Sequence, residues 1–278
     1  MPQKSFGSVE MASAYDELSD PQFTHGKTLI ALLGIRPGDR VLDIGCGTGR
    51  LAAFAVERMG VDGRVVGIDP ASPRIQVAQE RADPRLEFRI SEAQELSPFP
   101  DGSFDVAYLN SVFNWIRDKP RAFSEAHRVL KSGGRLGVGT TVQERPNQLG
   151  LIKSRAWKTV RGVSGRTEQD TSRASGKIGS NYVATAAEIR AMLEDAGFVP
   201  RIHEVRTFIS MFRDVAHIVD FLQATSYGDL APGASAADYA AFRRELEALF
   251  AGEYADCVSS DGIRLERYVL LAVADKPK

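Results

Sequence analysis

In the first half of the chain, short apolar runs alternate with stretches whose apolar residues recur every three or four positions. The short runs predict buried strands, and the 3.6-residue spacing predicts amphipathic helices. We expect strands at 40–44, 64–68, 86–90, 104–110 and 135–140, with helices at 9–34, 50–59, 73–82 and 119–131. Ser72 is the expected N-cap of the third helix, which Pro73 opens. The alternation is typical of a parallel sheet with crossover helices.

The second half of the chain is less regular. Residues 142–184 have weak periodicity and are rich in Arg, Ser, Thr and Gly, so we expect an insertion there with a mobile loop at 162–180. Helical spacing returns at 185–197, 214–225 and 236–251, and strands are expected at 198–210 and 266–274. We expect the two last strands to pair antiparallel at the edge of the sheet.

These elements predict a doubly wound α/β fold with a seven-stranded, mostly parallel sheet and a partly helical lid. The expected core covers residues 35–210 and 266–278, with a loop and helix insertion at 142–184. An N-terminal helical cap at 1–34 and a helical lid insertion at 211–265 complete the division. Ligands of such sheets bind at the carboxyl ends of the strands, here at the switch point between the first and fourth.

Composition and charge narrow the function classes. The 278 residues carry a net charge of −1, so no basic footprint for nucleic acid is present. Two cysteines, Cys46 and Cys257, are too few for a disulfide framework, which favours a reducing compartment. The first residues have no apolar core of a signal peptide, and no run reaches the ~20 apolar residues of a membrane span. We therefore expect a cytoplasmic protein without a membrane or nucleic-acid partner, and no oligomeric state is indicated.

A glycine-rich turn, DIGCGTGR, follows the first expected strand. Its spacing is G-x-G-x-G at Gly45, Gly47 and Gly49, whereas the dinucleotide fingerprint is G-x-G-x-x-G. Asp69 ends the second strand, where an acidic side chain can accept hydrogen bonds from both ribose hydroxyls. The pattern favours a nucleoside ligand, with an NAD(P)-dependent oxidoreductase on a related fold as one alternative.

The class I S-adenosylmethionine-dependent methyltransferases have first and second motifs that VLDIGCGTG and VVGIDPA resemble. Their third and fourth motifs are similar to SEAQELSPFPDGSFDVAYLNSVFNWI, and the segment that follows is similar to HRVLKSGGRLGVG. The resemblance covers roughly residues 35–141 and matches the small-molecule branch. It implies a Rossmann-like methyltransferase fold and S-adenosyl-L-methionine as cofactor. It also implies methyl transfer to a small organic molecule by in-line displacement in a lid-covered pocket.

The resemblance also implies which residues bind the cofactor. The glycine turn would line the methionine part, Asp69 would hold the ribose diol, and Pro70 would pack beside the adenine. Glu92 stands where the family usually has an Asp that accepts from the adenine amino group. The full set is Tyr15, Gln22, Gly45, Cys46, Gly47, Asp69, Pro70, Glu92, Ala93 and Asn110.

The substrate side carries weaker signals. Methyl transfer needs a general base only if the accepting atom is protonated, and no catalytic dyad is evident. The amino-methylating motif N-P-P-Y is replaced by NSVF at 110–113, which disfavours nucleic-acid methylation. Aromatic residues at 208–227 suit a small-molecule substrate with an apolar or planar part. No cluster has metal-ligand spacing. Candidates for the substrate side are Tyr15, His25, Phe113, Trp115 and His217.

A second alternative belongs to a different class, a non-catalytic protein that binds S-adenosylmethionine and serves as a regulator or partner subunit. A pocket closed beyond the methyl group would favour it.

Overall fold

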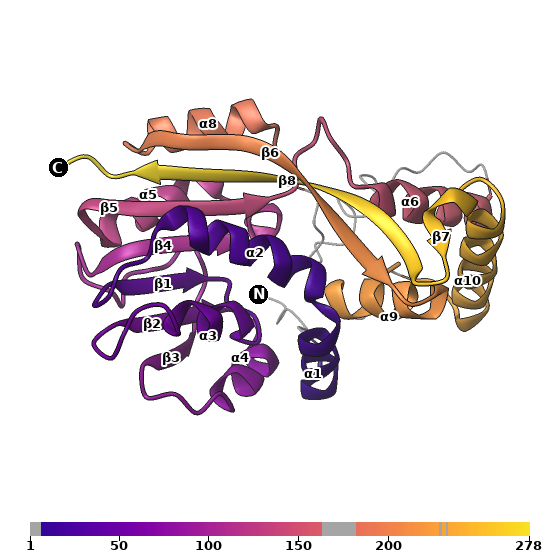
Figure 1. The fold of residues 1–278 in the computed structure, drawn as a ribbon, viewed down its shortest axis with the longest axis horizontal. Coiled ribbons are helices and arrows are strands. Elements are labelled where there is room, and N and C mark those ends of the chain that lie inside the picture. Colours follow the sequence, from indigo (N-terminus) through magenta and orange to yellow (C-terminus); the bar gives the residue numbers. More distant parts are fainter. Residues whose placement is uncertain (1–6, 163–181, 228–229, 232) are drawn as a thin grey trace.

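The computed structural model describes residues 7–162, 182–227, 230–231 and 233–278, and its centre is one sheet (Figure 1). The strand order is β3-β2-β1-β4-β5-β8-β6, with β7 paired to β8. β1 to β5 are parallel, and β8 pairs antiparallel with β5, β6 and β7. The strands are β1 Arg40–Ile44, β2 Arg64–Asp69, β3 Leu86–Ile90, β4 Phe104–Asn110, β5 Leu130–Thr140, β6 Val199–Phe212, β7 Val258–Ser259 and β8 Gly262–Asp275.

The predicted Rossmann-like α/β sheet with two antiparallel strands at its edge is confirmed. The strand count is eight rather than seven, because β7 has two residues and shows no periodicity in the sequence. The mobile loop expected at 162–180 lies, apart from Gly162, outside the described residues.

The helices deviate from prediction in three places. The expected helix at 9–34 is divided at Ser19, because Pro21 opens a new helix in its first turn. α4 starts at Ser72 with Ala71 as N-cap, so the expected N-cap was wrong by one residue. α6 lies within 142–184, where the sequence indicated weak order. The helices are α1 Val9–Leu18, α2 Asp20–Leu33, α3 Arg50–Val56, α4 Ser72–Gln79, α5 Lys119–Val129, α6 Gln148–Arg161, α8 Ala186–Asp195, α9 Val215–Thr225 and α10 Ala236–Ala251, with 3-10 turns η1 Phe113–Trp115 and η2 Ala255–Cys257.

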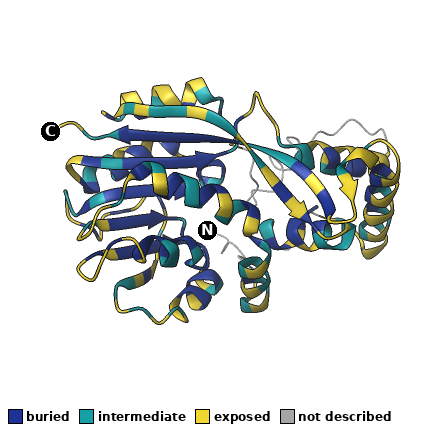
Figure 2. Cartoon of the chain, viewed as in Figure 1, coloured by how far each residue is buried: buried dark blue, intermediate teal, exposed yellow. Residues whose placement is uncertain are grey.

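Apolar side chains cover both faces of the sheet. Figure 2 shows its central strands mostly in the colour of buried residues. One cluster packs α2, α3 and α4 against the sheet, and the other packs α5 and α8 against the opposite face. A parallel sheet is normally buried on both sides, so its strands contain few polar residues. The few polar side chains that are buried at strand ends, such as Asp43 and Asp69, therefore need a specific reason.

β6 and β8 run beyond the rest of the sheet (Figure 1). Thr140, the last residue of β5, pairs with Leu270, so residues 262–269 of β8 extend past the carboxyl end of β5. Around this extension α6, α9 and α10 form a third apolar cluster, in which the rings of Trp157 and Phe242 stack at 4.4 Å. Segments that precede and follow β6 in the chain thus share one core.

Candidate functional site

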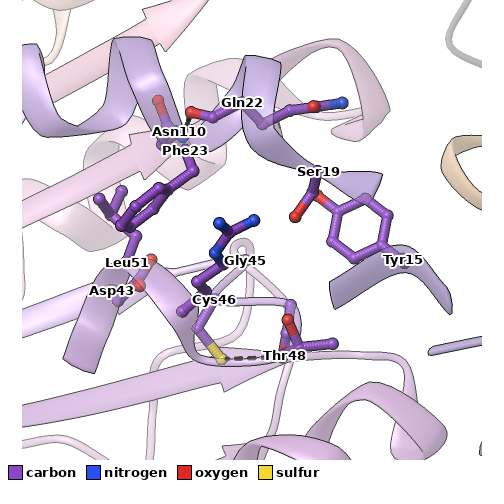
Figure 3. A pocket seen from close by; sticks show the side chains of 12 residues that line it. Tyr15, Ser19, Gln22, Phe23, Asp43, Gly45, Cys46, Thr48, Leu51 and Asn110 are labelled. Atoms are coloured by element: carbon purple, nitrogen blue, oxygen red, sulfur yellow. Dashed lines mark hydrogen bonds between the residues drawn. The ribbon is translucent and has the colours of Figure 1, made fainter. Parts of the chain in front are cut away.

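A cavity of about 390 Å³ lies over the carboxyl ends of β1, β2, β4 and β5. Its size is within the range of small-molecule sites. A smaller cavity of about 40 Å³ adjoins the glycine turn, beneath α1 and α2 (Figure 3). Tyr15, Gln22, Gly45 and Asn110 line both cavities, so the two form one site.

The glycine turn requires glycine at Gly45. This residue has φ of 78°, and a Cβ there would lie 2.1 Å from Cγ2 of Val112. Gly45 and Cys46 both donate their backbone N–H groups to the carbonyl of Ile68, which ties the turn to β2. The backbone is therefore held close to the cavity without side chains in between.

Asp69 ends β2 with a carboxylate that is 2% exposed. It accepts hydrogen bonds from the backbone N–H of Gly47 at 3.0 Å and of Ala71 at 2.8 Å. Burial raises the pKa of Asp69, although the nearby Arg74 guanidinium and these two N–H groups act in the opposite direction. The carboxylate is thus fixed between the glycine turn and the start of α4, facing the cavity.

Arg74 is sandwiched between two aromatic rings above Asp69. Its guanidinium carbon lies 4.1 Å from the ring centroid of Tyr15 and 4.0 Å from that of Tyr227. Both distances are within the range of cation–π contacts. The stack joins α1, α4 and the residues after α9, so it closes this end of the cavity.

Asp43 is the second buried carboxylate of the site. Asp43 is 2% exposed and lines the smaller cavity. Its carboxylate accepts a hydrogen bond of 2.8 Å from the Tyr108 hydroxyl. Burial raises the pKa of Asp43 to about 7, with the hydroxyl of Tyr108 opposing the shift and Asp69 adding to it.

This shift predicts a pH-dependent stability. Unfolded Asp has a pKa near 3.9, so between about pH 4 and pH 7 the folded state binds more protons, and the free energy of unfolding falls as pH rises. Asp43→Asn removes this cost. The difference in Tm between Asp43→Asn and the wild type should therefore be larger at pH 8 than at pH 4.5. We expect the increase to be at least about 2–4 °C, which corresponds to about 1 kcal/mol of unfolding free energy.

Asp105→Asn is the matched control for calorimetric melting. Burial raises the pKa of Asp105, but the N–H of Arg40 and the ammonium of Lys131 outweigh burial and lower it. The stabilisation from this lowered pKa is nearly complete above about pH 4, so the Tm of Asp105→Asn relative to the wild type should stay nearly constant between pH 4.5 and pH 8. A relative Tm of Asp43→Asn that does not depend on pH would show that Asp43 is ionised throughout.

Three buried amide oxygens of residues that line the site have no hydrogen-bond partner among the described residues: Oε1 of Gln22, Oδ1 of Asn110 and Oδ1 of Asn114. The amide nitrogen of Asn110 donates to the carbonyl of Gln22 at 3.1 Å, which fixes its oxygen as an acceptor. Buried acceptors without partners are costly. Together with the Asp69 carboxylate and the backbone of the turn, which lines the smaller cavity, the oxygens of Gln22 and Asn110 fit a ligand with an ammonium group and a ribose diol. S-adenosylmethionine has both groups.

Ser111 and His25 form a polar pair on the cavity wall. His25 Nδ1 lies 2.8 Å from the carbonyl of Pro21, and Nε2 lies 2.9 Å from Oγ of Ser111. The carbonyl can only accept, so Nδ1 carries the proton and the Ser111 hydroxyl donates to Nε2. Burial lowers the pKa of His25 well below its usual range, which keeps the ring neutral.

All ten residues that the resemblance implied for the cofactor line one or both cavities. Of the substrate-side candidates, Tyr15 and Trp115 line the larger cavity. Phe113 is fully buried and stacks on Phe123, while His25 lies behind Ser111. His217 does not line either cavity; its Nδ1 accepts from the N–H of Arg213. The roles of these residues remain predictions.

Sequence reasoning missed Arg74 and Arg267, and it assigned no role to Asp43 or Ser111. A signal for Arg267 was available, because it lies on the same face of the strand as Leu265 and Val269, which are 1% and 0% exposed. A charged residue on the buried face of a strand indicates a function. Arg74 and Ser111 had no comparable signal, since their neighbours come from distant segments.

In the ranges that the structure describes, no group of three or more His, Cys, Asp or Glu side chains could hold a metal ion. No helix of the same residues is long and apolar enough to cross a membrane.

Comparisons with known proteins identify the family of the chain. Residues 42–138 match the family described as "Methyltransferase domain". The chain is 35% identical over 179 residues to demethylmenaquinone methyltransferase of Thermus thermophilus, covering 61% of the chain and 78% of that relative. It is 27% identical over 243 residues to trans-aconitate 2-methyltransferase of Deinococcus radiodurans, covering 86% and 90%.

Other relatives are matched over part of their length. The chain spans 39% of arsenite methyltransferase of Halobacterium salinarum, with 30% identity over 172 residues and 60% of the chain covered. The fold is similar to the crystal structure of the YcgJ protein from Bacillus subtilis, with a TM-score of 0.60 at 20% identity over 92% of the chain and 99% of that protein. The chain belongs to the class I S-adenosylmethionine-dependent methyltransferases.

Proposed function

We propose that this chain transfers the methyl group of S-adenosylmethionine to a small organic molecule. The observation that carries the proposal is the continuity of the larger cavity. It extends from Asp69 and Glu92, past Asn110, to Lys153 of α6 and Leu222 of α9. Space therefore remains beyond the residues that fit the cofactor. Relatives matched over most of their own length are named for trans-aconitate and demethylmenaquinone.

The residues of the chain would act mainly by positioning. When bound, S-adenosylmethionine supplies a methyl group on a positively charged sulfur. Gln22 and Asn110 would hold its ammonium, and Asp69 its ribose, so that the acceptor meets the methyl group in a fixed orientation. Positioning of two reactants can supply much of a catalytic rate enhancement.

The proposed acceptor space is partly apolar. Trp115, Tyr182, Leu222 and Leu230 line it, and the rings of Trp115 and Tyr227 are 5.5 Å apart. These side chains suit an acceptor with an apolar or planar part and would exclude water from the reacting atoms. We assign α9 and α10 to the helical lid expected at 211–265, with α6 of the 142–184 insertion packed against it, and α1 and α2 to the N-terminal cap. A cytoplasmic location fits the free cysteines Cys46 and Cys257.

The Ser111–His25 pair would orient the acceptor rather than serve as its base. Burial and the nearby Arg267 hold the pKa of His25 well below its usual range, so the ring is a weak base. Because the Ser111 hydroxyl donates to Nε2 of His25, its Oγ is left to accept a hydrogen bond from a hydroxyl of the acceptor.

The test is a transfer assay with labelled cofactor. Purified protein, S-adenosylmethionine with a deuterated methyl group and a pool of small metabolites should yield a product heavier by one deuterated methyl group, detected by mass spectrometry. Heat-denatured protein is the control. Tight binding of S-adenosylhomocysteine without any labelled product would instead support the non-catalytic alternative.

A further inference from the structure

Arg267 is a cation on the extended part of β8. It pairs with Phe208 of β6, three residues before Leu270, and so lies past the end of β5. Its side chain lines the larger cavity, and its buried Nε has no hydrogen-bond partner in the described part of the chain. The residue therefore presents a guanidinium to the interior of the site.

No carboxylate of the described residues pairs with Arg267. Its charged form is favoured by one neighbouring group, the hydroxyl of Tyr15, and burial lowers the pKa of Arg267 to about 10. The nearby His25 is neutral. A buried charge without a partner is costly, and an anionic ligand would offset that cost.

Charges are unevenly distributed along the cavity. Its acidic residues, Asp69 and Glu92, lie at the ends of β2 and β3, on the side of the nucleoside. Arg74 lies beside Asp69 on that side and offsets part of its charge, and Arg117 follows η1. Lys153 of α6 and Arg267 of β8 line the other side, where no carboxylate of the described residues lines the cavity. In the strand order, β8 is four steps from β2, which places the two backbones roughly 19 Å apart at ~4.8 Å per step. The positive end is thus the acceptor end.

We propose that Arg267 binds a carboxylate of the methyl acceptor. This inference rests on the proposed function and specifies its substrate class as organic acids. The planar guanidinium matches a carboxylate in a paired, bidentate geometry, and a bond between ionised groups is stronger than a neutral one. The carboxylate serves to anchor the acceptor, whichever of its atoms receives the methyl group.

The experiment compares acids with uncharged analogues. Fumarate, tricarballylate, benzoate and octanoate are titrated by calorimetry into the protein saturated with S-adenosylhomocysteine, each beside its amide of similar shape. For the acid that binds best, Arg267→Gln should weaken binding by about 10- to 100-fold. Binding of the amide and of S-adenosylhomocysteine should change less than about twofold. Arg267→Lys, which keeps the charge, should lose less.

Arg264→Gln is the matched control, because Arg264 lies on the same strand but is exposed. It should leave all affinities unchanged, and melting curves of each variant establish that it is folded. Weaker binding of S-adenosylhomocysteine but not of acids would assign Arg267 to the carboxylate of the cofactor. Equal losses for acid and amide, or failure of all four acids to bind the wild type, would also overturn the proposal. Labelled transfer to an uncharged acceptor would overturn it while the proposed function stands.

Discussion

Asp69→Ala is expected to weaken binding of S-adenosylhomocysteine by about 100-fold or more. Asp69 ends β2 as a buried carboxylate aligned by the N–H groups of Gly47 and Ala71. If it accepts from both ribose hydroxyls, two charge-assisted hydrogen bonds are lost, each about 1.5–3 kcal/mol. Isothermal titration calorimetry of the folded variant measures the effect.

Adenosine and 2′,3′-dideoxyadenosine separate this role from a structural one. The wild type should bind adenosine more tightly, whereas Asp69→Ala should bind the two equally. Asp105→Ala is a suitable control, since Asp105 also accepts from a backbone N–H but lies at the opposite end of β4. Unchanged affinity of Asp69→Ala would remove the ribose assignment.

Gly45→Ala is expected to lower stability by about 3 kcal/mol and to abolish measurable cofactor binding. The positive φ of 78° costs about 1–2 kcal/mol in an L-residue, and overpacking against Val112 adds about 1–3 kcal/mol. Relief of the clash would shift the glycine turn, which is tied to Ile68. Thermal melting should show a Tm lower by roughly 6–12 °C.

Gly38→Ala isolates the backbone contribution. Gly38 has φ of 82°, but no atom would lie within 4 Å of its Cβ, so only the conformational cost remains. Val112→Ala combined with Gly45→Ala should recover part of the lost Tm, because it removes the two methyl groups in closest contact. If Gly38→Ala and Gly45→Ala lower the Tm equally, the side chain of Val112 moves aside with no loss of stability.

The cofactor end of the site was predictable because its residues are adjacent to strand ends. Gly45 directly follows β1 and Asp69 ends β2, and the parallel order brings these two strand ends together. Asn110 ends β4 in the same way. Such local relations between a strand and the turn after it can be read without tertiary contacts.

The acceptor end depends on contacts between distant segments. His25 and Ser111 are 86 residues apart, and no local pattern indicates that they meet. α6 has only three buried residues, Ile152, Ala156 and Trp157, which pack in one cluster with α9, α10 and the extended parts of β6 and β8. Its amphipathic pattern is therefore short, and it was obscured by surrounding basic and small residues.

The sequence by itself determined the fold class and a nucleoside ligand, because alternating strands and helices and the G-x-G-x-G turn with Asp69 are short-range features. The cofactor was implied by the resemblance of several motifs to those of the methyltransferases. Only the tertiary structure decided what faces the acceptor. The extension of β6 and β8 past β5 places Arg267 in the cavity and lets α6, α9 and α10 share one core. The physical reason is that burial and charge pairing depend on which segments approach one another in space, and no single segment records its partners.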